Sequence, residues 1–148
     1  MRTIDLRRLS TVLLFLYSLE LFAGQYPNQL TVLVVGAKAS TGQAIASLFS
    51  SADNYLSEPV VKQLMPINDA GEALFVFSGL EAGEYAVSVV YDKDGDGKLN
   101  TGFFGIPSEP VGFSNNAKAT FGPPSFHDAS FAFPQSEKIS ITLGRAKE

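Results

Sequence analysis

The sequence predicts an all-β sandwich that forms a single domain. Short segments that are rich in β-branched residues, or that alternate between apolar and polar residues, recur along the chain, and clusters of Gly, Pro, Asn and Asp separate them. No segment has the period of a good amphipathic helix. The 148 residues suit one domain and not two. The chain has no cysteine, so its fold depends on a hydrophobic core, and thiolate catalysis, zinc–thiolate sites and iron–sulfur clusters are excluded.

Residues 1–23 have the order of a secretory signal peptide, so we expect a periplasmic or secreted protein. A basic start over residues 2–8 precedes a mostly apolar run over residues 9–19, and the small residue Ala23 follows. The apolar run is shorter than the roughly 20 residues of a membrane-spanning helix. Leu21 stands where the cleavage site prefers a small residue, so an N-terminal segment that is retained as a membrane anchor is the alternative.

The mature chain is mildly acidic. Residues 1–23 hold three of the 11 basic and two of the 15 acidic residues, so their removal leaves a net charge of −5. A chain with this net charge lacks the excess of basic residues that would attract nucleic acid or an anionic membrane. We therefore expect no nucleic-acid partner, and a membrane contact only through a retained N-terminal segment.

Five strands are expected between residues 29 and 91, at residues 29–36, 43–50, 60–67, 72–78 and 84–91. The second of them also fits a helix, and the third is ambiguous because a proline falls near its end. Residues 68–71 have the composition of a hairpin turn. A glycine two residues before Tyr85 resembles a tyrosine corner, in which the phenol bonds back to the turn.

The segment from residue 101 to residue 134 predicts a long irregular insertion. It contains five prolines and several glycines, and no apolar period persists in it. Short strands are possible near residues 117–120 and 129–133, and residues 138–143 alternate as a closing strand. The expected domain thus spans residues 28–143, followed by a frayed tail at residues 144–148.

Residues 92–100 match the first three-quarters of a calcium-binding loop. Carboxylates fall at loop positions 1, 3 and 5, a glycine at position 6 allows the sharp turn, and oxygen donors follow at positions 7 and 9. The predicted metal ligands are Asp92, Asp94, Asp96, the carbonyl of Lys98, and Asn100.

The calcium pattern is incomplete at its end. Phe103 stands at position 12, where a bidentate Glu is usual, so two of about seven oxygen ligands are missing. Water, Glu109 or Asp128 would have to supply them. We expect weak calcium binding, with a Kd on the order of 0.1–1 mM. The alternative is a hairpin turn in which Asp and Gly supply only tight-turn chemistry.

Seven of the 12 phenylalanines lie between residues 103 and 133. They predict either a satellite core beneath the long insertion or a pocket that is apolar or stacks against sugars. The candidate ligand-binding residues of such a pocket are Phe103, Phe104, Ser114, Asn115, Asn116, His127 and Asp128.

Catalysis is not expected. His127 is the only histidine, and its side chain and that of Asp128 diverge if the segment is extended. No nucleophile-elbow motif surrounds Ser114 or Ser125. A hydrolase that uses His127 is therefore only a third alternative. We expect no cofactor other than weakly bound calcium.

Four segments together resemble one protein family. They are residues 77–87, 92–100, 104–117 and 121–129. They are similar to an uncharacterised exported bacterial family, the domain of unknown function numbered twenty-one forty-one, over nearly all of residues 29–143. Members typically carry a histidine where this chain has Tyr91. They often carry Asn where it has Asp94 and Asp96, so its extra carboxylates favour metal binding.

The family resemblance relates the chain to other proteins, but this family has no established activity. The turn before Tyr85 also resembles that of prealbumin-like and carboxypeptidase regulatory-like sandwiches, which are binding or accessory modules. This resemblance implies an immunoglobulin-like (prealbumin-like) antiparallel β-sandwich of about seven strands with one long irregular insertion. We therefore expect an exported, non-catalytic module that binds a ligand or partner through the loop face of residues 92–128. The alternative is a structural or accessory envelope protein without a small-molecule site.

Overall fold

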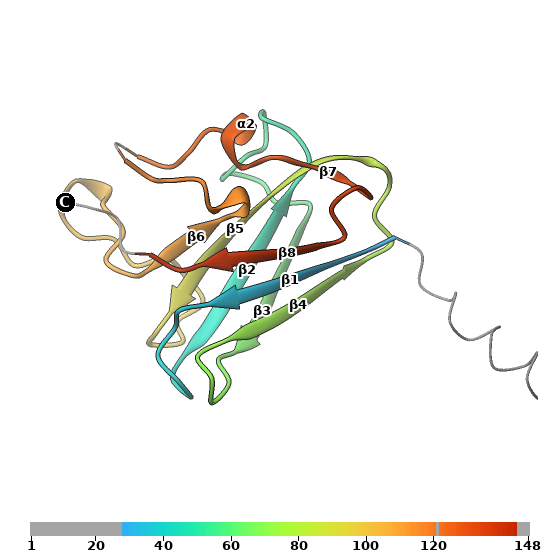
Figure 1. Ribbon diagram of the computed structural model, residues 1–148. Helices are drawn as coiled ribbons and strands as arrows, with labels where there is room; N and C mark the ends of the chain where they lie inside the picture. Colours follow the sequence, from blue (N-terminus) through green and yellow to red (C-terminus); the bar gives the residue numbers. More distant parts are fainter. Residues whose placement is uncertain (1–27, 121, 145–148) are drawn as a thin grey trace, which may run out of the picture.

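Eight strands form two facing sheets in the computed structural model, which describes residues 28–120 and 122–144 (Figure 1). The strands are β1 (Gln29–Val35), β2 (Gln43–Phe49), β3 (Val61–Pro66), β4 (Ala73–Ser78), β5 (Gly83–Asp92), β6 (Val111–Phe113), β7 (Phe131–Phe133) and β8 (Lys138–Thr142). Three short helical turns lie between them, namely η1 (Phe103–Gly105), η2 (Ser114–Asn116) and α2 (Phe126–Ala129). The predicted all-β sandwich is confirmed.

The two sheets differ in size and in strand direction. One sheet has the order β4-β1-β8, and the other has the order β3-β2-β5-β6, with β7 paired to the beginning of β5. All pairs are antiparallel except β1 and β8, which run parallel. The prediction of an antiparallel sandwich therefore missed one pair, because alternation in sequence reports a buried face and not a strand direction.

Alternation along the strands builds the core between the sheets. Successive side chains of a strand point to opposite faces, so every second residue of β1 and β4 faces the other sheet. The fully buried residues of the two inner faces include Leu30, Val32, Val34, Ala44, Ala46, Leu48, Phe75, Val87, Val89 and Ile141. The β5 alternation continues to Tyr91, which is also part of this core.

The two sheets join at one corner, where β6 meets the end of β8. Val111 and Gly144 exchange two backbone hydrogen bonds of 2.9 Å each. Gly112 permits this approach, because a Cβ atom there would lie 2.6 Å from the Cγ2 atom of Ile141. The corner brings the end of β8 next to the segment that follows β5.

Sequence and structure agree on the tyrosine corner and differ at four other places. The Tyr85 hydroxyl donates a hydrogen bond of 3.1 Å to the carbonyl oxygen of Glu81, as predicted. The turn at residues 68–71 exists, but it connects strands of different sheets and so makes no hairpin. Residues 117–120 form no strand, whereas the short β6 and α2 were not predicted.

Two of the predicted segments lie at the ends of the chain, mostly outside the described residues. The predicted signal peptide, residues 1–23, lies outside the described residues. Of the predicted frayed tail, Gly144 pairs with Val111, and residues 145–148 lie outside the described residues. Within residues 28–120 and 122–144, no helix has the length and apolar character needed to span a membrane.

Candidate functional site

Asp92 begins the acidic loop, residues 92–100, and is a buried hydrogen-bond acceptor. It is the last residue of β5, and its side chain is fully buried. Its carboxylate accepts four hydrogen bonds: Oδ1 from the backbone N–H groups of Gly95 (2.7 Å) and Asp96 (3.2 Å), and Oδ2 from the N–H of Gly97 (2.9 Å) and the side-chain amide of Gln43 (2.7 Å). A carboxylate offers about four lone-pair sites, so these donors saturate it.

The hydrogen bonds also set the charge state of Asp92. Burial alone raises the pKa of a carboxyl group because it penalises the charged form. The donors from Gln43, Gly97 and Gly95 favour the carboxylate more strongly, and they hold the pKa of Asp92 below its ordinary value of 3.8. Asp92 is therefore an ionised, fully hydrogen-bonded anchor at the base of the loop.

Asp94 and Asp96 complete a cluster of three carboxylates. One oxygen from each of Asp92, Asp94 and Asp96 lies within 4.8 Å of the others, a spacing at which they could ligate one cation. Asp94 accepts from the backbone of Asp96 and from the side-chain amide of Asn100, at 3.3 and 2.9 Å. Asp96 accepts from the N–H of Lys98 at 2.8 Å. These contacts fit both a calcium loop and a self-closed turn.

Glu109 reaches the acidic loop but does not join the carboxylate cluster. Its side chain is buried, and its two oxygens accept the N–H groups of Lys93 (2.9 Å) and Asn100 (3.0 Å). The cluster within the described residues contains neither Glu109 nor Asp128, the two residues that we considered as additional ligands. Glu109 thus clamps the two ends of the loop together.

The predicted ligand-binding residues Ser114, Asn115 and Asn116 hold backbone groups. Ser114 is buried; its hydroxyl accepts from the N–H of Val87 at 2.8 Å and donates to the carbonyl of Ala129 at 2.5 Å. The Asn115 amide donates to the Ser130 carbonyl at 2.6 Å. The Asn116 side chain accepts from the N–H of Thr142 and donates to the Ser140 carbonyl. Ser114 and Asn116 thus bind the insertion to the sandwich, whereas Asn115 joins two parts of the insertion.

His127 and Asp128 lie in the single turn of α2 and are both exposed. The Ser125 hydroxyl caps this turn: it accepts from the N–H of Asp128 at 3.2 Å and donates to its carboxylate at 2.7 Å. The hydrogen bond from Ser125 holds the pKa of Asp128 below its ordinary value, and the neighbouring His127 acts in the same direction. Because the Ser125 hydroxyl is bound to Asp128, it is not paired with the imidazole as a nucleophile would be.

The phenylalanines of the insertion mostly fill cores. Phe131 and Phe133 belong to the main core. Phe113 forms a second, smaller cluster with Ala86, Val111 and Ala129, against which Tyr55 and Phe126 pack. Phe103 differs from them, because 90% of its surface is exposed. The backbone of Phe104 lies in η1, but its side chain and all of Phe121 lie outside the described residues.

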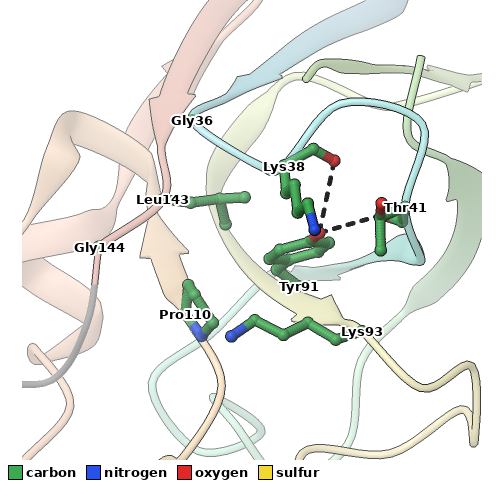
Figure 2. Close-up of a pocket in the computed structure, with 8 residues that line it drawn as sticks. All are labelled: Gly36, Lys38, Thr41, Tyr91, Lys93, Pro110, Leu143 and Gly144. Carbon is green, nitrogen blue, oxygen red and sulfur yellow. Dashed lines mark hydrogen bonds between the residues drawn. The ribbon is translucent and has the colours of Figure 1, made fainter. Parts of the chain in front are cut away.

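A hollow of about 490 Å³ opens beside Tyr91, where three segments that are distant in sequence meet (Figure 2). Its lining residues are Gly36, Lys38, Thr41, Tyr91, Lys93, Pro110, Leu143 and Gly144. They come from the turn between β1 and β2, from the end of β5 with the two ends of the loop that follows it (residues 93–110), and from the residues just after β8. This site was not predicted from the sequence, because only the tertiary fold brings these segments together.

Tyr91 organises the hollow. Its hydroxyl lies 3.0 Å from the carbonyl oxygen of Thr41 and 3.4 Å from that of Lys38, and it donates to the turn between β1 and β2. The ammonium group of Lys93 lies 5.8 Å from the centre of the Tyr91 ring. Figure 2 shows the side chains of Lys38 and Lys93 on opposite sides of this ring in the view drawn. The one sequence signal for the site was the alternation of apolar residues along β5. It ends at Tyr91, whose phenol needs a hydrogen-bond partner when it is buried.

Comparison with known proteins gives one match. Residues 32–142 match the model of a family described as an uncharacterized protein conserved in bacteria (DUF2141). The chain belongs to this family. No curated protein and no solved structure matched the chain. The immunoglobulin-like, prealbumin-like assignment therefore stays a prediction.

The DUF2141 match includes the acidic loop and most of the hollow. It begins within β1 and ends with the last residue of β8, so all eight described strands fall wholly or mainly within it. Of the residues that line the hollow, only Leu143 and Gly144 lie beyond the match. The family description gives no activity, so any function has to be inferred from the site itself.

Proposed function

We propose that this DUF2141 protein is an exported, non-catalytic binding module that takes a ligand or partner through the loop face of residues 92–128. The hollow beside Tyr91 is the observation that carries this proposal. Lys93 and Pro110, at the two ends of the loop after β5, form one side of it. Its volume falls within the roughly 300–1,000 Å³ of small-molecule sites.

Rigid surroundings support a binding role. Glu109 and Asp92 fix both ends of the acidic loop through their buried carboxylates. Tyr91 fixes the turn between β1 and β2. A site that is held in place before binding loses less conformational entropy when the ligand arrives. The loop therefore serves as a preorganised wall of the hollow.

The described residues offer little for catalysis. A hydrolase needs a nucleophile, a base and an orienting group in mutual contact. The exposed His127 stands on α2, and the nearest serine that we considered, Ser125, is engaged with Asp128. A binding module accounts for the arrangement better than the hydrolase alternative.

A screen of small fragments by ¹⁵N–¹H correlation NMR tests the binding proposal. We expect fragments to shift the amide signals of Gly36, Lys38, Lys93 and Gly144. Val61 in β3, on an edge strand whose residues do not line the hollow, serves as the internal control. Binding that maps only to other surfaces, or no binding by any fragment, would favour the structural or accessory envelope protein.

Weak calcium binding is the second part of the proposal, and the carboxylate cluster supports it. An ion would have to replace at least one donor of the saturated Asp92, which keeps the expected affinity low. With a Kd of about 0.1–1 mM, 10 mM calcium would add about 1.4–2.7 kcal/mol to the free energy of unfolding. Thermal melting should show this gain in the wild type and not in Asp96→Asn. Equal melting temperatures with and without calcium would contradict the proposed calcium binding and leave the proposed binding at the hollow untouched.

Export is proposed from the N-terminal sequence alone. Expression in a bacterial host, followed by fractionation and mass measurement, tests it. We expect a periplasmic or secreted protein that has lost residues 1–23. A full-length protein in the membrane fraction would instead support the retained anchor.

A further inference from the structure

We propose that the hollow beside Tyr91 binds an organic anion, namely a carboxylate or phosphate group on a small apolar body. This inference rests on the proposed binding function and adds the chemical class of the ligand. It is argued from the charge of the lining residues, from the position of the nearby carboxylates, and from the apolar floor.

The charge of the hollow is opposite to that of the whole chain. Among the residues that the structure describes, its lining includes Lys38 and Lys93 and no acidic residue, although the chain has a formal net charge of −4. The two lysines come from separate segments, the turn after β1 and the residue after β5. A concave site that is lined by one sign of charge concentrates ligands of the opposite sign. The fold therefore assembles a cationic hollow on an acidic protein.

The carboxylates next in sequence to the lining residues Lys93 and Pro110 are engaged elsewhere. Asp94, which is exposed, accepts a hydrogen bond from the side-chain amide of Asn100. Asp92 and Glu109 are both buried, and their oxygens accept the N–H groups of the acidic loop. Tyr91 and Asp92 are successive residues of β5, so their side chains point to opposite faces of the strand. Tyr91 lines the hollow, whereas Asp92 meets Gln43. Within residues 28–120 and 122–144, the lining of the hollow therefore supplies no carboxylate to match the two ammonium groups.

The floor of the hollow suits an apolar body. The Tyr91 ring, Pro110 and Leu143 are its main apolar lining. Lys93 lies within the distance at which a cation is attracted to the face of an aromatic ring, which holds its ammonium group beside this floor. A ligand that carries both an anionic group and a ring or short chain would satisfy both features. An ammonium group acts as a point charge, so the site would accept a carboxylate or a phosphate.

The test compares three probes that share one ring: benzoate, phenyl phosphate and benzamide. Titrations are followed by the amide shifts of Gly36, Lys38 and Gly144. We expect both anions to bind at least tenfold more tightly than the neutral benzamide, and to weaken as salt screens the lysines. The tighter of the two anions identifies the preferred group.

Three single variants locate the effect. Lys38→Met and Lys93→Met keep the length of the side chain and remove its charge, and each should weaken benzoate binding by about threefold to tenfold. Lys138→Met is the matched control, because Lys138 is an exposed lysine at the other end of β8 from Leu143. It should bind benzoate like the wild type. Dispersed NMR spectra establish that each variant is folded.

The outcomes separate this inference from the proposed function. Equal affinity for benzoate and benzamide at the hollow, or full affinity in both lysine variants, would overturn the anionic ligand and leave the binding module intact. If none of the three probes binds at the hollow while neutral fragments do, the anionic ligand is likewise overturned and the binding module stands. If no compound of any charge binds there, both the inference and the proposed function fail.

Discussion

The side-chain amide of Gln43 donates a hydrogen bond of 2.7 Å to the buried carboxylate of Asp92. Gln43 is the first residue of β2, and Asp92 is the last residue of β5 and its register partner. This contact joins the ends of two central strands at the point where the acidic loop begins. Asp92 also accepts three backbone N–H groups of that loop, so it links strand pairing to loop conformation.

Asp92→Asn should destabilise the protein by about 2–3 kcal/mol at neutral pH. The amide nitrogen of Asn cannot accept a hydrogen bond, so it would face donors that the second carboxylate oxygen now satisfies. Chemical denaturation of both proteins measures the difference in the free energy of unfolding. Asp94→Asn, at an exposed position of the same loop, is the control and should cost much less.

The cost of Asp92→Asn should also depend on pH. Because the pKa of Asp92 is lower in the folded state than its ordinary value of 3.8, its charge stabilises the fold above that value. The stabilisation is lost as pH falls through the lower pKa of the folded state. The difference between wild type and variant should therefore be constant near neutral pH and narrow below about pH 4. A difference that stays the same down to pH 2 would contradict this role.

Ser114→Ala should destabilise the protein by about 1–3 kcal/mol. β7 pairs with β5 up to Tyr85, and β6 pairs with it from Ser88, so the Ser114 hydroxyl satisfies the buried N–H of Val87 in the gap between them. Alanine would leave this donor without a partner. Ser78→Ala, on the exposed side of β4, is the control for removing a hydroxyl. Equal unfolding midpoints for the two variants would show that the gap does not depend on Ser114.

Tyr91→Phe should cost about 1 kcal/mol and loosen one wall of the hollow. The variant keeps the aromatic ring and loses the hydrogen bond to the Thr41 carbonyl. Tyr85→Phe is a matched control, because it also loses one phenolic hydrogen bond, to the Glu81 carbonyl. We expect similar losses of stability, but amide shifts at residues 36–42 only for Tyr91→Phe. Undisturbed shifts there would mean that the phenol does not position the turn.

The regular strands could be predicted because their side chains alternate. The closing strand was expected at residues 138–143 and spans Lys138–Thr142. β6 could not be predicted in this way, because three residues after a proline have no period. Its place depends on pairing with Ser88–Val90 and on the fit of Gly112 against Ile141. The helical turn α2 did have a local signal, a serine three residues before Asp128, which is the spacing of a helix cap.

The candidate site was predicted only in its local part. The acidic loop is contiguous, so its carboxylates could be recognised from spacing alone, and they do cluster. The roles of Gln43 and Glu109 could not be recognised, because neither residue belongs to the loop in sequence. The hollow depends on Lys38, Tyr91 and Leu143, which only the packing of the two sheets brings together.

The most direct test of the binding site is a measurement of intermolecular NOEs between the ring protons of benzoate and the protein. We expect NOEs to the ring protons of Tyr91 and to the methyl groups of Leu143, which line the hollow. Contacts with residues outside the hollow, and none with these two side chains, would contradict it.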